Sequence, residues 1–131
     1  MEELKLGLTF RQETEVVYEN TAAAVGSGAA EVFSTPSMIA LMETAAMYAV
    51  APCLDEGQGT VGVHLDVAHL AATPTGHRVW AVAELIEIDR KMLIFKVEAF
   101  SDVEKIGEGI HKRCIINNEK FFSKVYEKYG K

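Results

Sequence analysis

One acidic residue, Glu43, stands in the middle of an apolar segment that has the length of a helix. The segment runs from Pro36 to Val50 and is apolar on nearly every side when it is drawn as a helix. Such a helix is expected to be buried all round, and an ionised carboxylate there is costly unless it is paired, hydrogen-bonded or neutralised. An acid kept in that place suggests chemistry, because functional sites are where local rules are broken. The alternative is an acid at the helix edge that reaches solvent.

His69 is the second candidate for chemistry. Residues 60–70 alternate in polarity as a half-buried strand does, and side chains of a strand point to its two faces in turn. His69 therefore ends an apolar face of odd-numbered residues, while His64 and Asp66 lie on the opposite face. The other residues of the apolar face are Val61, Val63, Leu65 and Val67. A histidine in this place either makes a hydrogen bond within the core or faces Glu43 across a site.

Thr35 is the third candidate, because it precedes Pro36 at the start of the expected helix. A threonine there is ordinarily a cap, but a hydroxyl at a helix N-terminus also lies where backbone N–H groups favour an oxyanion. Thr35 and Glu43 are eight residues apart in the sequence. This spacing corresponds to about 12 Å along a straight helix. If both residues serve one site, a partner chain or the substrate must bridge them.

Motifs of several other enzyme classes are missing from the sequence. It contains no GxSxG elbow, no GxxxxGK phosphate loop and no HExxH zinc motif. Cys53 and Cys114 form no CxxC pair, and the four histidines lack metal-ligand spacing on a common face. We therefore expect neither a metal nor a cofactor. The two cysteines are expected to be free thiols of a cytoplasmic protein.

Composition and charge narrow the range of partners. The 131 residues suffice for one domain with its own core, and residues 1–131 are taken as that domain. The formal net charge of −6 argues against nucleic acid as the main partner, because phosphate binding needs clustered Lys and Arg. The sequence shows neither a signal-peptide pattern nor an apolar run long enough to span a bilayer, so no membrane association is expected.

The elements that must position these residues follow from the hydrophobic pattern. The first half predicts a strand at 9–18, a small-residue loop or lid at 20–30, a short strand at 31–33 and the helix that ends near residue 50. The second half predicts strands at 60–70, 77–88, 92–100 and 105–117 and an amphipathic helix at 118–131. One antiparallel sheet can bury a helix on one face, so we predict an α+β fold in which a twisted sheet wraps the central helix.

Four stretches of the chain together resemble the hot-dog-fold thioesterases, and within them the fluoroacetyl-CoA thioesterase-like group. The stretches are Phe33–Pro36 with Glu43, Gly59–Gly62, Val67–Gly76 and Gly107–Arg113. Their most specific feature is a threonine, a glutamate eight residues later and a histidine 26 residues after that. The resemblance implies an antiparallel sheet around a central helix, a homodimer or dimer of dimers whose sheets join, and active sites between subunits.

The resemblance also implies an activity and its residues. It makes Thr35, Glu43 and His69 the catalytic residues of an acyl-CoA thioesterase and places Gly62 and Arg113 in the acyl pocket. In the fluoroacetyl-specific enzyme the segment before the threonine carries phenylalanines that form a lid, whereas Thr21–Ala30 of this chain contains no aromatic residue. A small or medium acyl-CoA, rather than fluoroacetyl-CoA, is therefore the expected substrate.

Other functions remain open from the sequence. The same scaffold could hydrate an enoyl thioester, although the Asp and His arrangement of such hydratases is not seen here. It could also hold an acyl-CoA as a binding or regulatory protein without turnover, since a fold does not determine a function. In a third alternative, Glu43 and His69 form a buried hydrogen-bonded pair that only specifies the core.

Overall fold

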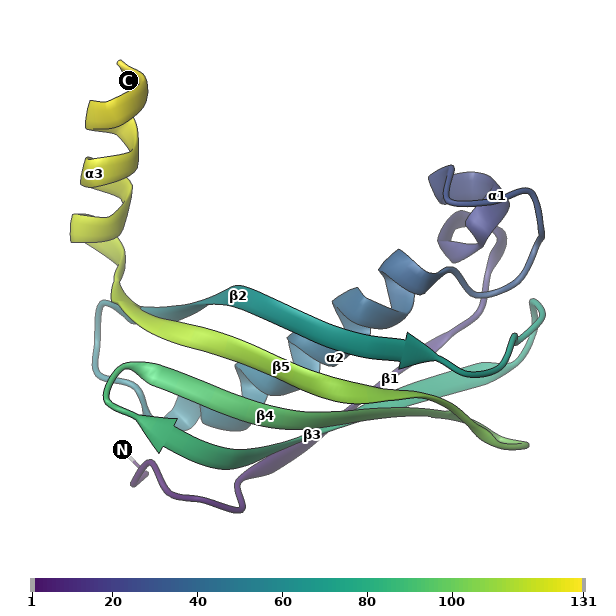
Figure 1. Cartoon of the computed structure of the whole chain (residues 1–131), viewed down its shortest axis with the longest axis horizontal. Coiled ribbons are helices and arrows are strands. Elements are labelled where there is room, and N and C mark those ends of the chain that lie inside the picture. Colours follow the sequence, from purple (N-terminus) through teal and green to yellow (C-terminus); the bar gives the residue numbers. More distant parts are fainter. Residues whose placement is uncertain (1, 131) are drawn as a thin grey trace.

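A long helix, α2 (Thr35–Val50), lies against one face of a curved, five-stranded antiparallel sheet (Figure 1). The computed structural model describes residues 2–130. Its strands are β1 (Thr9–Glu15), β2 (Gln58–His69), β3 (Arg78–Asp89), β4 (Met92–Ser101) and β5 (Lys105–Asn117). Their order across the sheet is β1-β3-β4-β5-β2, so β1 and β2 are the two edges. The predicted α+β fold, with a sheet wrapped around a central helix, is confirmed.

The start of α2 follows from local chemistry. Ser34 is the N-cap, and its hydroxyl accepts a hydrogen bond from the backbone N–H of Ser37. Pro36 lies in the first turn, where its missing N–H would have had no partner in any case. Thr35 is thus the first helical residue, and its own hydroxyl is not needed for the cap. This leaves the Thr35 side chain available for another contact.

The core lies between α2 and the concave face of the sheet. Alanines on the inner side of the helix, such as Ala45 and Ala46, let the helix approach the strands closely. The largest fully buried side chains on the two sides of this contact are Met38, Met42, Leu85, Leu93, Phe95 and Val97. Burying such side chains is the main stabilising contribution to a domain of this size. The helix is thereby fixed in position and orientation against the sheet, where it packs most extensively on β3 and β1.

The apolar composition of α2 had suggested that the helix is enclosed on every side, but one of its sides is open. Met47 and Tyr48 keep 37% and 43% of their surface exposed, and the side chain of Glu43 keeps 37%. The prediction of an all-round buried helix is therefore wrong for the described chain. The physical reason is that a single sheet covers one side of a helix and leaves the other side open. Glu43 lies at the border between the covered and the open side.

A bulge in β2 changes which residues face the helix. The register with β5 shifts between Gly62 and His64, so Val63 is an extra residue without a cross-strand partner. Such a residue reverses the alternation of the strand on one side of it. Before the bulge Thr60 and Gly62 face α2 with Arg113, and after it Val67 does. The prediction that Val61 and Val63 share the helix-facing side with His69 is therefore wrong.

The segment between β1 and α2 is more structured than a loop. It contains the one-turn helices η1 (Tyr18–Asn20) and α1 (Ala22–Val25), and Thr21 caps the second of them. The expected strand at 31–33 is only a pair of isolated bridges, made by Val32 and Phe33. The first strand ends at residue 15, three residues earlier than predicted. Most of residues 22–31 stay exposed at one end of the sheet (Figure 1).

Two shorter helices complete the chain. The one-turn helix η2 (Ala51–Cys53) continues α2, and α3 (Asn118–Tyr129) follows β5. α3 projects away from the sheet at the end opposite α1, and none of its residues is buried (Figure 1). Its predicted last residue, 131, lies outside the described residues.

Two features are absent from residues 2–130. No helix in this part of the chain combines the length and the apolar character needed to cross a membrane. The same residues contain no group of three or more His, Cys, Asp or Glu side chains arranged to hold a metal ion.

Candidate active site

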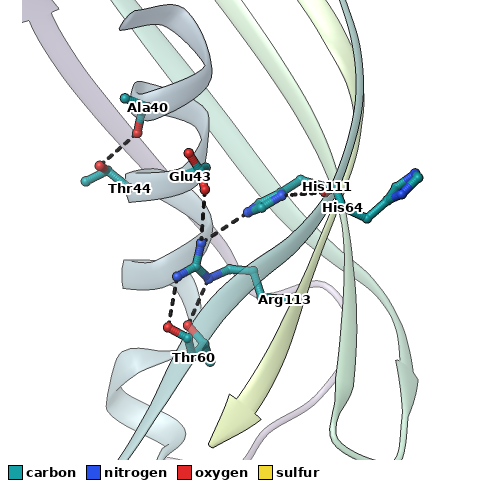
Figure 2. Close-up of polar contacts among 7 residues, drawn as sticks. All are labelled: Ala40, Glu43, Thr44, Thr60, His64, His111 and Arg113. Atoms are coloured by element: carbon teal, nitrogen blue, oxygen red, sulfur yellow. Dashed lines mark hydrogen bonds and ion pairs between the residues drawn. The ribbon is translucent and has the colours of Figure 1, made fainter. Parts of the chain in front are cut away.

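Arg113 forms the centre of a polar cluster on the helix-facing side of β5. Its side chain is 6% exposed. The Nε–H donates to the hydroxyl of Thr60 at 2.8 Å, and Nη2 donates to the Thr60 carbonyl at 3.0 Å. Figure 2 shows that the guanidinium reaches from the strand towards α2, where Oε2 of Glu43 lies 3.9 Å from Nη1. A nearly buried cation is thus held along one edge by two hydrogen bonds to Thr60 and faces the carboxylate of Glu43.

His111 lies two residues before Arg113 on the same face of β5. It is fully buried, and its Nε2 is 3.2 Å from Nη1 of Arg113 (Figure 2). Its Nδ1 is 2.9 Å from the carbonyl oxygen of His64 on β2. Burial, together with the nearby guanidinium, lowers the pKa of His111 below its ordinary value of 6.5. The ring is therefore neutral at neutral pH.

Gly62 is the point where these side chains meet. A Cβ atom built on it would lie 2.7 Å from Oε2 of Glu43, 3.1 Å from Cε1 of His111 and 3.4 Å from Nη1 of Arg113. A side chain at this position would displace the carboxylate. The absence of one leaves a small exposed space bounded by an acid, a guanidinium and strand backbone. This space can receive a small polar group such as a carbonyl oxygen.

Thr35 and His69 form a second polar pair at the N-terminal end of α2. The hydroxyl of Thr35 lies 2.8 Å from Nδ1 of His69, which ends β2. The Nε2 of His69 is buried and makes no hydrogen bond within residues 2–130. Burial lowers the pKa of His69, and the backbone of Ala71 opposes part of this shift. A neutral imidazole with one free nitrogen is therefore in contact with an exposed hydroxyl.

A pocket borders this second pair. Its volume is about 310 Å³, and it is lined by Val32, His69, Leu70, Ala71 and Ala72. The lining is apolar apart from the imidazole. An acyl chain or a thioester next to His69 would find apolar contact here.

The predicted site residues therefore fall into two groups on one chain. Glu43, Gly62 and Arg113 are brought together at the middle of α2, and Thr35 and His69 at its start. Glu43 and His69 form no hydrogen bond with each other in the described chain, so the alternative of a core-specifying pair is wrong. The two groups are separated by two turns of helix, or about 12 Å along its axis.

Sequence reasoning missed two members of the Arg113 cluster, Thr60 and His111. Both could have been found by strand periodicity, because residues two apart on a strand share a face. His111 lies two before Arg113, and Thr60 lies two before Gly62. The bulge after Gly62 hid the second relation, since it made the odd-numbered residues of β2 look like one continuous face.

The fold that carries this site occurs in known proteins. The chain superposes over 99% of its length on 98% of a Thermus thermophilus hypothetical protein described as a thioesterase superfamily member, with a TM-score of 0.88 and 27% identity. It superposes over 98% of its length on 99% of a mutant fluoroacetyl-CoA-specific thioesterase, with a TM-score of 0.91 and 36% identity. Fold and site together define a thioester hydrolase of the hot-dog class.

The family can be stated more narrowly. Residues 16–119 match the family described as fluoroacetyl-CoA-specific thioesterase. The fluoroacetyl-CoA thioesterase of Streptantibioticus cattleyicolor is 44% identical over 98 residues, which cover 75% of this chain and 70% of that protein. The chain belongs to this thioesterase family, as its sequence motifs had predicted.

Proposed function

We propose that the protein hydrolyses a small or medium acyl-CoA to the free acid and CoA, with Thr35, Glu43 and His69 as catalytic residues. The observation that carries this proposal is the convergence of the Glu43 carboxylate and the Arg113 guanidinium on the exposed face of Gly62. A carboxylate can act there on the thioester carbonyl, and a guanidinium can stabilise the charge that develops on its oxygen.

Glu43 can act by two routes that end in the same products. As a general base it takes a proton from water, and the water oxygen then attacks the carbonyl carbon. As a nucleophile its own oxygen attacks, which gives an acyl–Glu43 anhydride that water later hydrolyses. In both routes the carbon–sulfur bond breaks and the thiolate of CoA leaves. A single turnover in ¹⁸O-labelled water reveals the second route if water attacks the Glu43 carbonyl carbon of the anhydride, because the label then enters Glu43 and the first acid product carries none.

Thr35 and His69 are assigned to the acyl and leaving-group side of the reaction. The hydroxyl of Thr35 binds or polarises the acyl group near the oxyanion. The neutral imidazole of His69 either orients Glu43, or takes up the proton that Glu43 removes from the attacking water and passes it to the departing sulfur. The free Nε2 of His69 and the apolar pocket beside it support this assignment. The hydrogen bond to Thr35 fixes the ring in the orientation that the transfer requires.

The acyl group is proposed from the segment that precedes α2. Two of the relatives named above are described as fluoroacetyl-CoA thioesterases, but residues 21–30 of this chain contain no aromatic side chain. The short helix α1 within this segment carries only three alanines and a valine. A cover of small side chains leaves more room over the acyl group, which supports small or medium acyl groups other than fluoroacetyl.

We also propose that the active form is a homodimer joined along β2. β2 is an edge strand, and an open edge offers unpaired backbone groups to a second strand. Val63 and Leu65 on this edge keep 51% and 40% of their surface exposed. Across such a joint, Thr35 and His69 of one protomer would meet Glu43 and Arg113 of the other, which removes the separation along α2. The free thiols of Cys53 and Cys114 support a reducing, cytoplasmic location.

The proposed reaction is tested by thiol release from a panel of acyl-CoAs with short, long and aromatic acyl groups. The Glu43→Gln variant keeps the size of the side chain but removes the charge and the base. We expect its kcat to fall by about 10²- to 10⁴-fold on the best substrate. Glu87→Gln is the matched control, because Glu87 is exposed on β3 and touches none of the site residues. Full activity of Glu43→Gln would contradict the assignment, and binding of acyl-CoA without release by the wild type would favour a binding protein.

A further inference from the structure

His111 is fully buried next to Arg113, and the reaction proposed above gives it no role. A buried imidazole needs partners for both ring nitrogens, because an unsatisfied polar atom in the interior is costly. Both nitrogens of His111 have one. The identity of these two partners determines where the proton of the ring is.

The partners permit only one neutral tautomer. The carbonyl oxygen of His64 can only accept, so Nδ1 of His111 donates to it. The guanidinium of Arg113 can only donate, so Nε2 accepts from Nη1. His111 is thus an acceptor for a cation and is held in that state by the backbone of a neighbouring strand. The ring of Phe95 from β4, stacked at a centroid distance of 6.4 Å, fixes the plane of the imidazole.

The hydrogen bonds of Arg113 show how the acceptor nitrogen of His111 affects the orientation of the guanidinium. A guanidinium has five N–H donors. Thr60 takes those of Nε and of one Nη2 hydrogen, and His111 takes one from Nη1. The second hydrogen of Nη1 is on the side of Glu43 and of the space above Gly62. Without His111, Nη1 would have no fixed neighbour apart from a carboxylate 3.9 Å away.

We propose that His111 is a positioning residue that aims the Nη1 hydrogen of Arg113 into the space between Glu43 and Gly62. This inference rests on the proposed function, since that space is where the thioester carbonyl is placed. Only the neutral imidazole can do this. A proton on Nε2 removes the acceptor and brings a second positive charge to 3.2 Å from Nη1. The charged groups that face the ring are Arg113 on β5 and Glu43 on α2, while the imidazole of His64 on β2 points away from it (Figure 2) and has only a small effect on its pKa.

Two substitutions separate positioning from support of the core. In His111→Gln the amide oxygen reaches about as far as Nε2 and can accept from Arg113. In His111→Asn the amide nitrogen replaces Nδ1 and can donate to His64, but no atom reaches Arg113. Both variants lose the stacked ring, so both are expected to lose similar stability. We expect kcat per folded protein to fall about tenfold or more in His111→Asn and to stay within about threefold of wild type in His111→Gln.

A second measurement does not depend on activity. In ¹⁵N–¹H NMR spectra the wild type should show His111 as the Nδ1–H tautomer and slowly exchanging Nη hydrogens of Arg113. The Arg113 signals should disappear in His111→Asn and persist in His111→Gln. On acidification of the wild type they should disappear as Nε2 of His111 takes up a proton. The titration needs no substitution, so it decides the matter even if His111→Asn does not fold.

The outcomes are distinguishable from a failure of the proposed function. If the wild type releases no thiol from any acyl-CoA, the proposed reaction fails while the NMR signals still test the positioning. If Arg113 keeps its signals after protonation of His111 or in His111→Asn, or if the two variants are equally active, the positioning role is wrong. Loss of signals and of activity in His111→Asn alone supports it.

Discussion

Gly62 is the residue on which the geometry of the candidate site depends most directly. Its missing side chain leaves room for Oε2 of Glu43, which lies 2.7 Å from the position of a Cβ atom. The closest atom is the end of a flexible side chain rather than backbone, and the next, Cε1 of His111 at 3.1 Å, has to yield by only a few tenths of an ångström. An alanine at this position would therefore move the carboxylate at little cost to the fold.

The Gly62→Ala variant is therefore expected to lose activity without losing stability. We expect kcat to fall about 10- to 100-fold because the carboxylate is displaced, and the free energy of unfolding to change by less than about 1 kcal/mol. Gly59→Ala on the same strand is the matched control, since its Cβ would meet Oδ1 of Asn118 at 2.8 Å and no site residue. Thiol release and urea unfolding measure the two effects. Equal activity of both variants would show that the position of Glu43 is not critical.

The contact between Thr35 and His69 gives a second prediction at the level of residues. Thr35→Val keeps the shape of the side chain but removes the hydroxyl that lies 2.8 Å from Nδ1 of His69. We expect a fall in kcat of about 10²-fold, with activity largely restored in Thr35→Ser. Thr44→Val serves as control, because the hydroxyl of Thr44 bonds only to the carbonyl of Ala40 one turn earlier in α2 (Figure 2). A fully active Thr35→Val would leave the threonine with a structural role alone.

The sequence reveals a site residue when its type differs from that of its neighbours along the chain. Glu43 is conspicuous because it interrupts an apolar helix, and Thr35 because it precedes a helix-starting proline. His111 and Thr60 are not conspicuous, because a histidine and a threonine within strands are ordinary residues. Their importance arises from Arg113, and a sequence does not show which partners a buried guanidinium finds across strands.

At the level of elements, the bulge in β2 is what places the site residues on one side. Without the extra residue Val63, either Gly62 or His69 would point away from α2. The sequence showed a regular alternation through this region, because Val61 and Val63 are as apolar as a core-facing pair. They are partly or largely exposed instead. A bulge depends on cross-strand pairing, so the pattern of a single strand could not reveal it.

Close packing of α2 and β2 against β5 gives a prediction for two glycines. A Cβ on Gly107 would lie 2.5 Å from Sδ of Met38, which is a flexible side chain of α2. A Cβ on Gly109 would overlap the carbonyl oxygen of Asp66 and the backbone of Val67, which cannot move without the strand. We expect Gly107→Ala to cost about 1–3 kcal/mol and Gly109→Ala to cost more. Urea unfolding measures both, and the opposite order would contradict this account of the packing.

For the whole molecule, the order of elements and the sheet around one helix could be predicted because hydrophobic periodicity reports burial directly. The open side of α2 could not be predicted from the sequence. A helix that is covered by a partner chain has the same apolar composition as a helix buried in its own fold. Residues such as Met47 and Tyr48 are exposed in the single chain, although the apolar composition of α2 predicted them to be buried. The composition of α2 is accordingly that of a helix in the proposed dimer.

The half-buried His69 and the fully buried His111 predict how stability depends on pH. Burial lowers the pKa values of His69 and His111 in the folded state below the ordinary value of 6.5. The unfolded state therefore binds more protons, and the free energy of unfolding falls as pH decreases from about 6.5 towards the folded-state values. The pKa values of Glu13 and Glu108, lowered by hydrogen bonds to Arg78 and Lys105, matter only below about 4.5.

Urea unfolding at pH 7.5, 6.0 and 5.0 tests this window. We expect the midpoint to decrease over these steps in the wild type and to decrease less in His111→Gln, which cannot take up the proton. His77→Gln is the control, because His77 is partly exposed beside Asp102 on the surface. A midpoint that does not change between pH 7.5 and 5.0 would show that the histidines do not limit stability in this range.

The last prediction concerns which chain supplies which part of the site. In the proposed dimer, Thr35 of one protomer serves the same site as Glu43 of its partner. Thr35→Val and Glu43→Gln homodimers are each expected to be nearly inactive. In a mixed dimer, however, the Glu43 of the Thr35→Val chain meets the intact Thr35 of the other chain, so one of the two sites is complete. A two-fold dimer repeats each contact twice, which is why one site is restored and the other carries both substitutions.

Mixing the two variants in equal amounts and allowing subunits to exchange gives half mixed dimers. Activity should therefore rise to about a quarter of the wild-type value, a level that neither variant reaches alone. The control mixes the Glu43→Gln variant with a variant that carries both Thr35→Val and Glu43→Gln. No chain in that mixture has an intact Glu43, so no site can be complete. If mixing restores nothing although light scattering shows dimers that exchange, each chain uses its own Thr35 and Glu43. The substrate would then have to span the separation along α2 within a single protomer.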